Sequence, residues 1–169
     1  MSSDKKVPRN RWLAHALARR TFVSRAIPDA SVNALEKAVG MAERGSSGQI
    51  RLVIEAHWPL THVKHQTPRG RALEWFSQLR VWDTEHNNGV LVYLLFAERD
   101  VEIVADRGFN SRVTAAQWEA ICKAMEARFA KNEFEAGITE GINAIGDLLR
   151  QHFASDMGRN EQTDRPVLA

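Results

Sequence analysis

The feature that most constrains the fold is an uncharged run of nine residues, 89–97, with the sequence GVLVYLLFA. Residues 89–96 are apolar on both faces of an extended chain, which is typical of a central strand covered by helices on each side. A short connection over residues 97–100 then leads into a second β-rich run, residues 101–105. Because a connection of this length joins antiparallel neighbours, the two runs predict the middle of a small β-sheet.

Periodic patterns in the rest of the sequence place one more strand and several helices around this pair. Alternation of apolar and polar residues predicts a strand over residues 49–58. Helical spacing predicts helices over residues 11–23, 29–44, 69–81, 114–130 and 132–153. The order is βαββαα behind N-terminal helices, which predicts an α/β fold with a small central β-sheet sandwiched by helices. We expect a basic N-terminal segment with a short helix (1–26), a globular domain (27–153) and a disordered tail (154–169).

The composition is that of an ordinary soluble globular protein, with 44% hydrophobic and 26% charged residues. A net charge of +2 gives no reason to expect a nucleic acid partner. No run approaches the roughly 18 to 20 apolar residues of a membrane span, and basic side chains interrupt residues 12–23, where a signal peptide needs an apolar core. The single cysteine, Cys122, falls in an apolar helical pattern, which favours a buried thiol. We therefore expect a cytoplasmic protein.

The first 25 residues are strongly basic. They hold one acid, Asp4, against seven basic residues: Lys5, Lys6, Arg9, Arg11, Arg19, Arg20 and Arg25. This pattern is typical of a solvated chain start. It also allows peripheral membrane contact, in which Trp12, Leu13 and Leu17 enter the interface beside the basic residues. In either case we expect the segment before Ile27 to be dispensable for folding.

Several segments, taken in order, resemble the TPM domain family. They are GSSGQIRLVIEA (45–56), NNGVLVYLLF (87–96), ERDVEI (98–103), DRGFN (106–110) and RFAKNEFEAGITEGINAIGDLL (128–149). The tetrad of residues 88–91 and the spacing of Phe129, Phe134, Gly137 and Gly141 are the most specific parts. The resemblance covers residues 45–153 and implies a central sheet sandwiched by helices. Two turns depart from the family pattern: Glu98 replaces an Asp, and Asp106 replaces the first Gly of a Gly-x-Gly turn.

The resemblance also implies functions. Plant members of the family are associated with divalent metal binding, weak acid phosphatase activity and photosystem repair, and other members act as accessory membrane-associated modules. Bacterial members often accompany the LemA family. The resemblance therefore implies a protein partner, such as a LemA-family protein or a membrane-anchored TPM protein.

Polar residues gather at one end of the two apolar runs. Since these strands are expected to be antiparallel, residues 83–88 and 106–110 converge at one end of the sheet. Hard cations such as Ca²⁺ prefer carboxylate and carbonyl oxygens. The candidate ligands for Ca²⁺ or another divalent cation are Asp83, Glu85, Asn87, Asn88, Asp106 and Asn110, and Gly89, Arg107 and Gly108 complete the cleft. The alternative is a left-handed turn at Asn88-Gly89 with solvated acids.

Three functional hypotheses remain open from the sequence. The first is an accessory or interaction module with a divalent-cation site at one end of the sheet. The second is a weak, metal-dependent acid phosphatase, which the family resemblance supports. The third is a peripheral membrane-associated component.

Overall fold

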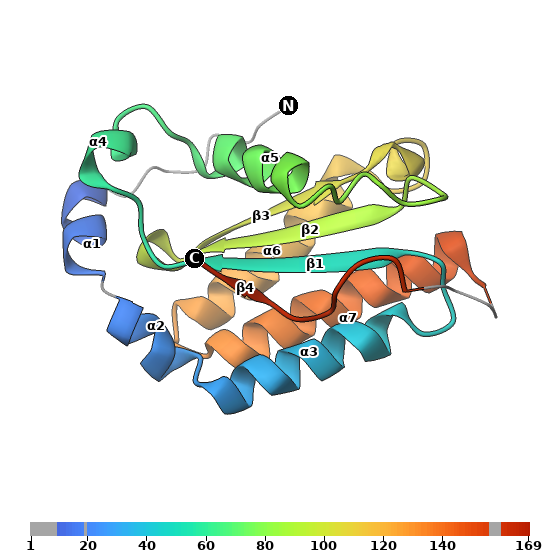
Figure 1. Ribbon diagram of the computed structural model, residues 1–169, viewed down its shortest axis with the longest axis horizontal. Coiled ribbons are helices and arrows are strands. Elements are labelled where there is room, and N and C mark those ends of the chain that lie inside the picture. Colours follow the sequence, from blue (N-terminus) through green and yellow to red (C-terminus); the bar gives the residue numbers. More distant parts are fainter. Residues whose placement is uncertain (1–9, 19, 156–159) are drawn as a thin grey trace.

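The computed structural model describes residues 10–18, 20–155 and 160–169 (Figure 1). Its elements are α1 (Arg11–Leu17), α2 (Arg20–Ala26), α3 (Asp29–Glu43), β1 (Gln49–Glu55), α4 (Leu60–Val63), α5 (Pro68–Gln78), β2 (Gly89–Leu95), the 3₁₀ helix η1 (Phe96–Glu98), β3 (Asp100–Ala105), the 3₁₀ helix η2 (Arg107–Phe109), α6 (Ala115–Phe129), α7 (Phe134–Phe153) and β4 (Val167–Leu168). Asp4, Lys5, Lys6, Arg9 and Arg19 of the basic segment lie outside the described residues.

Strand β2 is the centre of a four-stranded sheet with the order β3-β2-β1-β4. It pairs with β1 in parallel and with β3 in antiparallel orientation, as the short connection between β2 and β3 predicts. All seven residues of β2 are buried. Alternate side chains enter two separate apolar clusters, with Val90 on one side and Leu91 on the other. The prediction of a central strand covered on both faces is therefore confirmed.

Helices form the two outer layers of the domain. Figure 1 shows α3 and α7 below the sheet and α5 above it. Helix α7 packs between α3 and α6, and its apolar residues join the larger cluster, which also holds Ile50 of β1. Helix α5 contributes Ala72 to the smaller cluster on the opposite face. The predicted α/β fold, a small sheet sandwiched by helices, is thus the fold of the structure.

The C-terminal residues return to the sheet. Val167 and Leu168 form β4, which pairs in parallel with Val53 and Ile54 of β1. The prediction of a disordered tail is therefore wrong for residues 160–169. Polar composition suggested disorder, but the apolar end of the segment meets a sheet edge that no earlier strand covers.

The N-terminal helix that sequence periodicity predicts over residues 11–23 is divided into α1 and α2. Helix α1 is tied to the domain by His15, which is only 3% exposed. The Trp58 amide donates to His15 Nδ1 at 2.9 Å, so Nε2 carries the ring proton and donates to Glu98 Oε1 at 2.7 Å. Arg11 Nε donates to the same oxygen at 2.8 Å. These contacts argue against the expectation that the segment before Ile27 is dispensable for folding, which an unfolding measurement can test.

Burial alone raises the pKa of Glu98, but the hydrogen bonds from His15 and Arg11 outweigh it and hold the pKa below its ordinary value. The two donors from α1 therefore favour the charged form of Glu98. This carboxylate is the anchor that fixes α1 to the connection between β2 and β3.

We predict that His15→Ala lowers the free energy of unfolding by about 1–3 kcal/mol, because it leaves the Trp58 amide without a partner and removes one of the two donors to Glu98 Oε1. Urea unfolding of the full chain measures the effect. The control is His62→Ala, an exposed histidine in α4, whose loss should change the free energy by no more than about 0.5 kcal/mol. Equal unfolding curves for both variants would show that α1 is not part of the stable fold.

Candidate functional site

The two polar loops meet at one end of the sheet, as the antiparallel pairing of β2 and β3 predicts. The Asp106 amide donates to the Gly89 carbonyl at 2.9 Å, and the Gly108 amide donates to the Asn87 carbonyl at 2.9 Å. Arg107 Nε also donates to Asn87 Oδ1 at 2.9 Å. Backbone and side chain together hold the loop before β2 against the loop after β3.

Two glycines allow close backbone packing at this end of the sheet, and one of them, Gly108, lies between the two loops. A Cβ atom on Gly89 would lie 2.0 Å from the Val81 carbonyl oxygen, and one on Gly108 would lie 2.5 Å from the Asn87 carbonyl oxygen. Both distances are far below van der Waals contact, so a side chain on Gly108 would separate the two loops, whereas one on Gly89 would displace Val81 within the connection that precedes β2. The left-handed residue of the turn is Asn87, with φ of 52°, rather than Asn88 or Gly89.

Four of the six predicted cation ligands are either exposed to solvent or already bonded to another side chain. Asp83 is exposed and pairs with Arg80 at 2.8 Å. Glu85 and Asn110 are also exposed. The side-chain oxygen of Asn87 accepts from Arg107. These four residues lie around the end of the sheet, and no hydrogen bond or ion pair among the described residues brings their oxygens to a common point.

The other two predicted ligands, Asn88 and Asp106, carry buried oxygens without a hydrogen-bond donor among the described residues. Asn88 is fully buried, and its Nδ2 donates to Ser47 Oγ at 3.0 Å, which leaves Oδ1 unpaired. Asp106 Oδ1 accepts from the Arg107 amide at 2.7 Å, while Oδ2 is unpaired. Buried polar atoms are nearly always bonded to protein, water or an ion, so these two oxygens require a partner.

Arg107 is not that partner. Its guanidinium bonds the neutral amide of Asn87, and it forms no ion pair with a carboxylate in the part of the chain that the structure describes. Among the same residues no group of three or more histidine, cysteine, aspartate or glutamate side chains is arranged to hold a metal. A cation here would therefore take amide or hydroxyl oxygens as well as a carboxylate.

Three neighbours of the loops were not predicted from the sequence. Ser47 accepts from Asn88, and Thr84 Oγ1 accepts from the Asn88 amide at 3.1 Å. Glu161, from the C-terminal segment, receives the Glu85 amide at 3.3 Å. Ser47 lies two residues before β1, the strand that pairs with β2. Correct prediction of the strand order would therefore have placed Ser47 near Asn88. Nothing in the sequence near Glu161 indicates that the segment returns to this end.

A second buried carboxylate, Glu55, lies at the opposite end of β1. Arg71 donates to it through Nη2 at 2.7 Å and Nε at 2.9 Å, and the Tyr93 hydroxyl donates at 2.6 Å. The indole nitrogens of Trp58 and Trp75 donate at 3.1 and 3.3 Å. Burial raises the pKa of Glu55, but these donors outweigh it and lower the pKa. With so many donors already bound, Glu55 fixes α5 to the sheet and is not free for catalysis.

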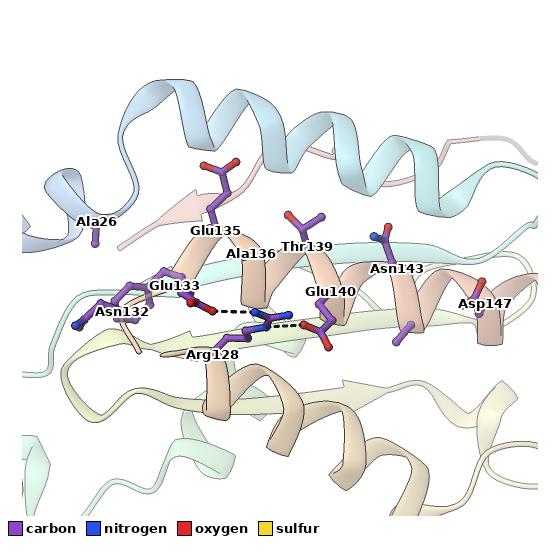
Figure 2. A pocket seen from close by; sticks show the side chains of 12 residues that line it. Ala26, Arg128, Asn132, Glu133, Glu135, Ala136, Thr139, Glu140, Asn143 and Asp147 are labelled. Atoms are coloured by element: carbon purple, nitrogen blue, oxygen red, sulfur yellow. Dashed lines mark hydrogen bonds and ion pairs between the residues drawn. The ribbon is translucent and has the colours of Figure 1, made fainter. Parts of the chain in front are cut away.

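Figure 2 shows a groove of about 920 Å³ along the outer side of α7. Its floor is made of small residues such as Ala136 and Thr139, and Arg128 spans it to reach Glu133 and Glu140, each at 2.9 Å. These three side chains are exposed, so the ion pairs contribute little to stability. The groove is an open surface feature with paired charges, and it holds no arrangement typical of catalysis.

Glu43, at the end of α3, is the third buried carboxyl. Its Oε1 accepts from the Ile50 amide at 2.6 Å. Burial and the nearby Asp164 raise its pKa to about 8, while the Ile50 hydrogen bond and Arg51 oppose the rise. Glu43 is therefore largely protonated in the folded protein at neutral pH.

Comparison with known proteins agrees with this architecture. The family model described as TPM domain matches residues 24–148. The NMR structure of BA42 from the psychrophilic bacterium Bizionia argentinensis superposes with a TM-score of 0.75 at 24% identity, covering 85% of this chain and 95% of that one. The N-terminal domain of cg2496 from Corynebacterium glutamicum gives a TM-score of 0.57 at 12% identity, covering 80% and 82%. No curated protein sequence matches the chain.

We predict that Glu43→Gln becomes increasingly stabilising relative to the wild type between about pH 5 and pH 8. The raised pKa means that the unfolded chain loses its Glu43 proton near the ordinary pKa of 4.5, while the folded chain keeps it up to about pH 8. Rising pH therefore lowers the stability of the wild type through this group, and the variant escapes that loss. Urea unfolding across this range measures the difference. Glu85→Gln, at an exposed carboxylate, is the control for charge removal, and parallel curves for wild type and Glu43→Gln would contradict the prediction.

Proposed function

The chain belongs to the TPM domain family, and we propose that it is an accessory interaction module whose sheet-end loops bind a divalent cation such as Ca²⁺. The observation that carries the proposal is the pair of buried, unpaired oxygens, Asn88 Oδ1 and Asp106 Oδ2. Leaving a buried polar group unpaired costs about 1–3 kcal/mol, more where the group is charged. A hard cation bound to oxygen removes this cost.

The fit of a cation rests on the chemistry of the residues at this end of the sheet. Asp106 supplies a negative charge that no basic side chain of the described residues neutralises. Asn88 supplies an amide oxygen, and Ser47 supplies a hydroxyl that accepts from the nitrogen of the same amide group. Carboxylate, amide and hydroxyl oxygens are the donors that Ca²⁺ takes in proteins. When bound, the ion would supply positive charge to Asp106 and fix the two loops.

The loops need little reorganisation to accept an ion. The amides of Asp106 and Gly108 already bond across to Gly89 and Asn87, and the absence of a side chain on Gly108 allows the two backbones to be in contact. Affinity is therefore not lost to ordering of the loops. Exposed groups on the same loops, Arg107 and Glu85, remain available to a protein partner such as a LemA-family or membrane-anchored TPM protein.

The phosphatase alternative receives less support. Metal-dependent hydrolysis needs carboxylates that converge around the ion, and the transferred phosphoryl group needs nearby positive charge. Asp83 faces Arg80 in an exposed pair. Arg99 lies in the connection at the other end of β2 and β3, where it bonds Asn132 at 2.7 Å. Arg107 is a basic residue that lies at the same end of the sheet as the predicted ligands.

A second candidate role, peripheral membrane contact, is favoured by a specific surface. Trp12, Leu13 and Leu17 of α1 are 46%, 55% and 61% exposed, and Phe22 of α2 is 48% exposed. Among the described residues, no helix is long and apolar enough to cross a bilayer. An apolar helix face of this kind suits binding at the interface plane rather than insertion across it.

For the cation, we predict that saturating Ca²⁺ raises the melting temperature of the wild type. A hundredfold excess over Kd stabilises by about 2.7 kcal/mol, which corresponds to about 5–10 °C for a domain of this size. Asp106→Asn should abolish the shift, because the amide retains the cap on η2 but has no charge. Calorimetry with and without a chelator measures it.

The matched control is Asp83→Asn, which makes the same chemical change at an exposed residue near the same loops. It should leave the Ca²⁺ response intact. A response lost in Asp83→Asn and kept in Asp106→Asn would move the site to the outer loop residues. A wild type that ignores millimolar Ca²⁺ and Mg²⁺ would refute the cation site.

For the membrane role, we predict that the full chain floats with vesicles containing anionic lipid and that Leu13→Glu combined with Leu17→Glu abolishes flotation. Both leucines are exposed, so the change should leave the fold intact. Met41→Glu, an exposed apolar residue on α3 (62% exposed), is the control and should float as the wild type does. Flotation that is equal in all three proteins would rule out the α1 surface.

A further inference from the structure

We propose that the outer edge of β1 is a binding site for an extended peptide, and that residues 160–169 are a built-in occupant which a segment of the partner replaces. The inference rests on the proposed role as an interaction module and names the chemistry of its partner. The segment contacts the loop before β2 through Glu161, and a chelator, which removes any bound cation, allows the two proposals to be tested separately.

The edge is only partly covered by a strand. On its inner side β1 pairs with β2 along all seven residues, whereas on its outer side only Val53 and Ile54 have strand partners. The pairing extends by two further bonds: the Ala169 amide donates to the Ile54 carbonyl at 2.9 Å, and the Ala56 amide donates to the Ala169 carbonyl at 2.8 Å. A strand this short adds little stability by itself.

The rest of the segment is held by long side chains of β1 that contact its backbone. Gln49 Oε1 accepts from the amides of Glu161 and Gln162 at 2.8 and 2.9 Å. Arg51 Nη1 donates to the carbonyl of Thr163. Contacts to backbone groups do not depend on the side chains of the bound segment. The same groups of β1 therefore suit other extended peptides.

The edge amide next to this region is capped by a side chain rather than a strand. The Gln49 amide bonds inward to the Asn88 carbonyl, so the next amide, that of Ile50, points outward. There it donates to the Glu43 carboxyl at 2.6 Å. This cap prevents strand pairing on the N-terminal part of β1. The peptide site therefore has two parts: the side chains of Gln49 and Arg51, and the backbone edge from Val53 to Ala56.

Side-chain contacts of β4 define what a replacement peptide needs. Pro166 is buried, and Val167 packs against the smaller apolar cluster on the α5 side of the sheet. Leu168 points away and is 49% exposed. Upstream, Arg165 pairs with Glu36 at 3.0 Å in an exposed position. The partner is therefore an extended segment with an apolar pair, of the Pro-Val type, preceded by polar residues.

Addition of a strand to an exposed sheet edge is a common mode of peptide recognition, in which main-chain bonds give affinity and alternate side chains give specificity. The built-in segment competes with any such partner, because both need the same atoms of β1. The apparent affinity for the partner is lowered by the fraction of molecules in which the edge is free. Weakening β4 should therefore strengthen binding of an added peptide.

The test uses the full chain, in the presence of chelator so that the cation loops play no part. The probe is a fluorescein-labelled peptide with the sequence of residues 160–169, NEQTDRPVLA. Fluorescence anisotropy should show binding at least about tenfold tighter to Val167→Asp than to the wild type. The matched control is Leu168→Asp, which makes the same kind of change at the exposed neighbour and should bind as the wild type does.

Hydrogen exchange at the Ala56 amide locates the event. Since this amide donates to Ala169, its exchange should be faster in Val167→Asp and should slow again when the unlabelled peptide is added. Failure of the peptide to bind or to restore protection would overturn the proposal, whatever the outcome with Ca²⁺. A dimer that forms with rising concentration and protects Ala56 would instead assign the edge to a second copy of this chain and overturn the choice of partner.

Discussion

Complete burial of β2 is the constraint from which the rest of the structure follows. A strand with seven buried residues needs backbone partners on both sides and apolar cover on both faces. The partners are β1 and β3, and the cover comes from α3, α6 and α7 on one face and α5 on the other. Polar residues can then appear only where β2 enters or leaves the sheet. This explains why Asn88 lies at one end of the strand and the Glu98 anchor lies beyond the other.

Buried carboxyl groups show how differently the same side chain is accommodated in one domain. Glu55 and Glu98 are charged because arginine, tyrosine, tryptophan and histidine donors surround them. Glu43 has one amide donor and an acidic neighbour, and it keeps its proton. Asp106 has one amide donor and an unpaired second oxygen. The number of donors separates Glu55 and Glu98, which connect helices to the sheet, from Glu43 and from Asp106, the carboxylate that we propose binds an ion.

The central part of the fold could be predicted from the sequence because it depends on periodicity. Residues 89–96, the alternation around Ile50 and the capping box at Thr114 are local patterns, and all three correspond to elements of the structure. The meeting of the two polar loops followed from antiparallel pairing alone. The contacts of His15 and Glu161 could not be predicted, since each joins segments more than 70 positions apart. The unpaired oxygens of Asn88 and Asp106 could not be predicted either, because they depend on packing in three dimensions.

The Glu43 carboxyl that caps the Ile50 amide also bears on how the chain avoids self-association. An open strand edge is a template on which other chains can add strands and aggregate. Residues 160–169 are synthesised after all the rest of the described fold, so the outer edge of β1 lacks β4 while the chain is being made. Glu43 comes from the helix directly before β1 and is in place by then. The Glu43 side chain thus interrupts the ladder of outward-facing amides and protects the nascent domain from edge-to-edge pairing.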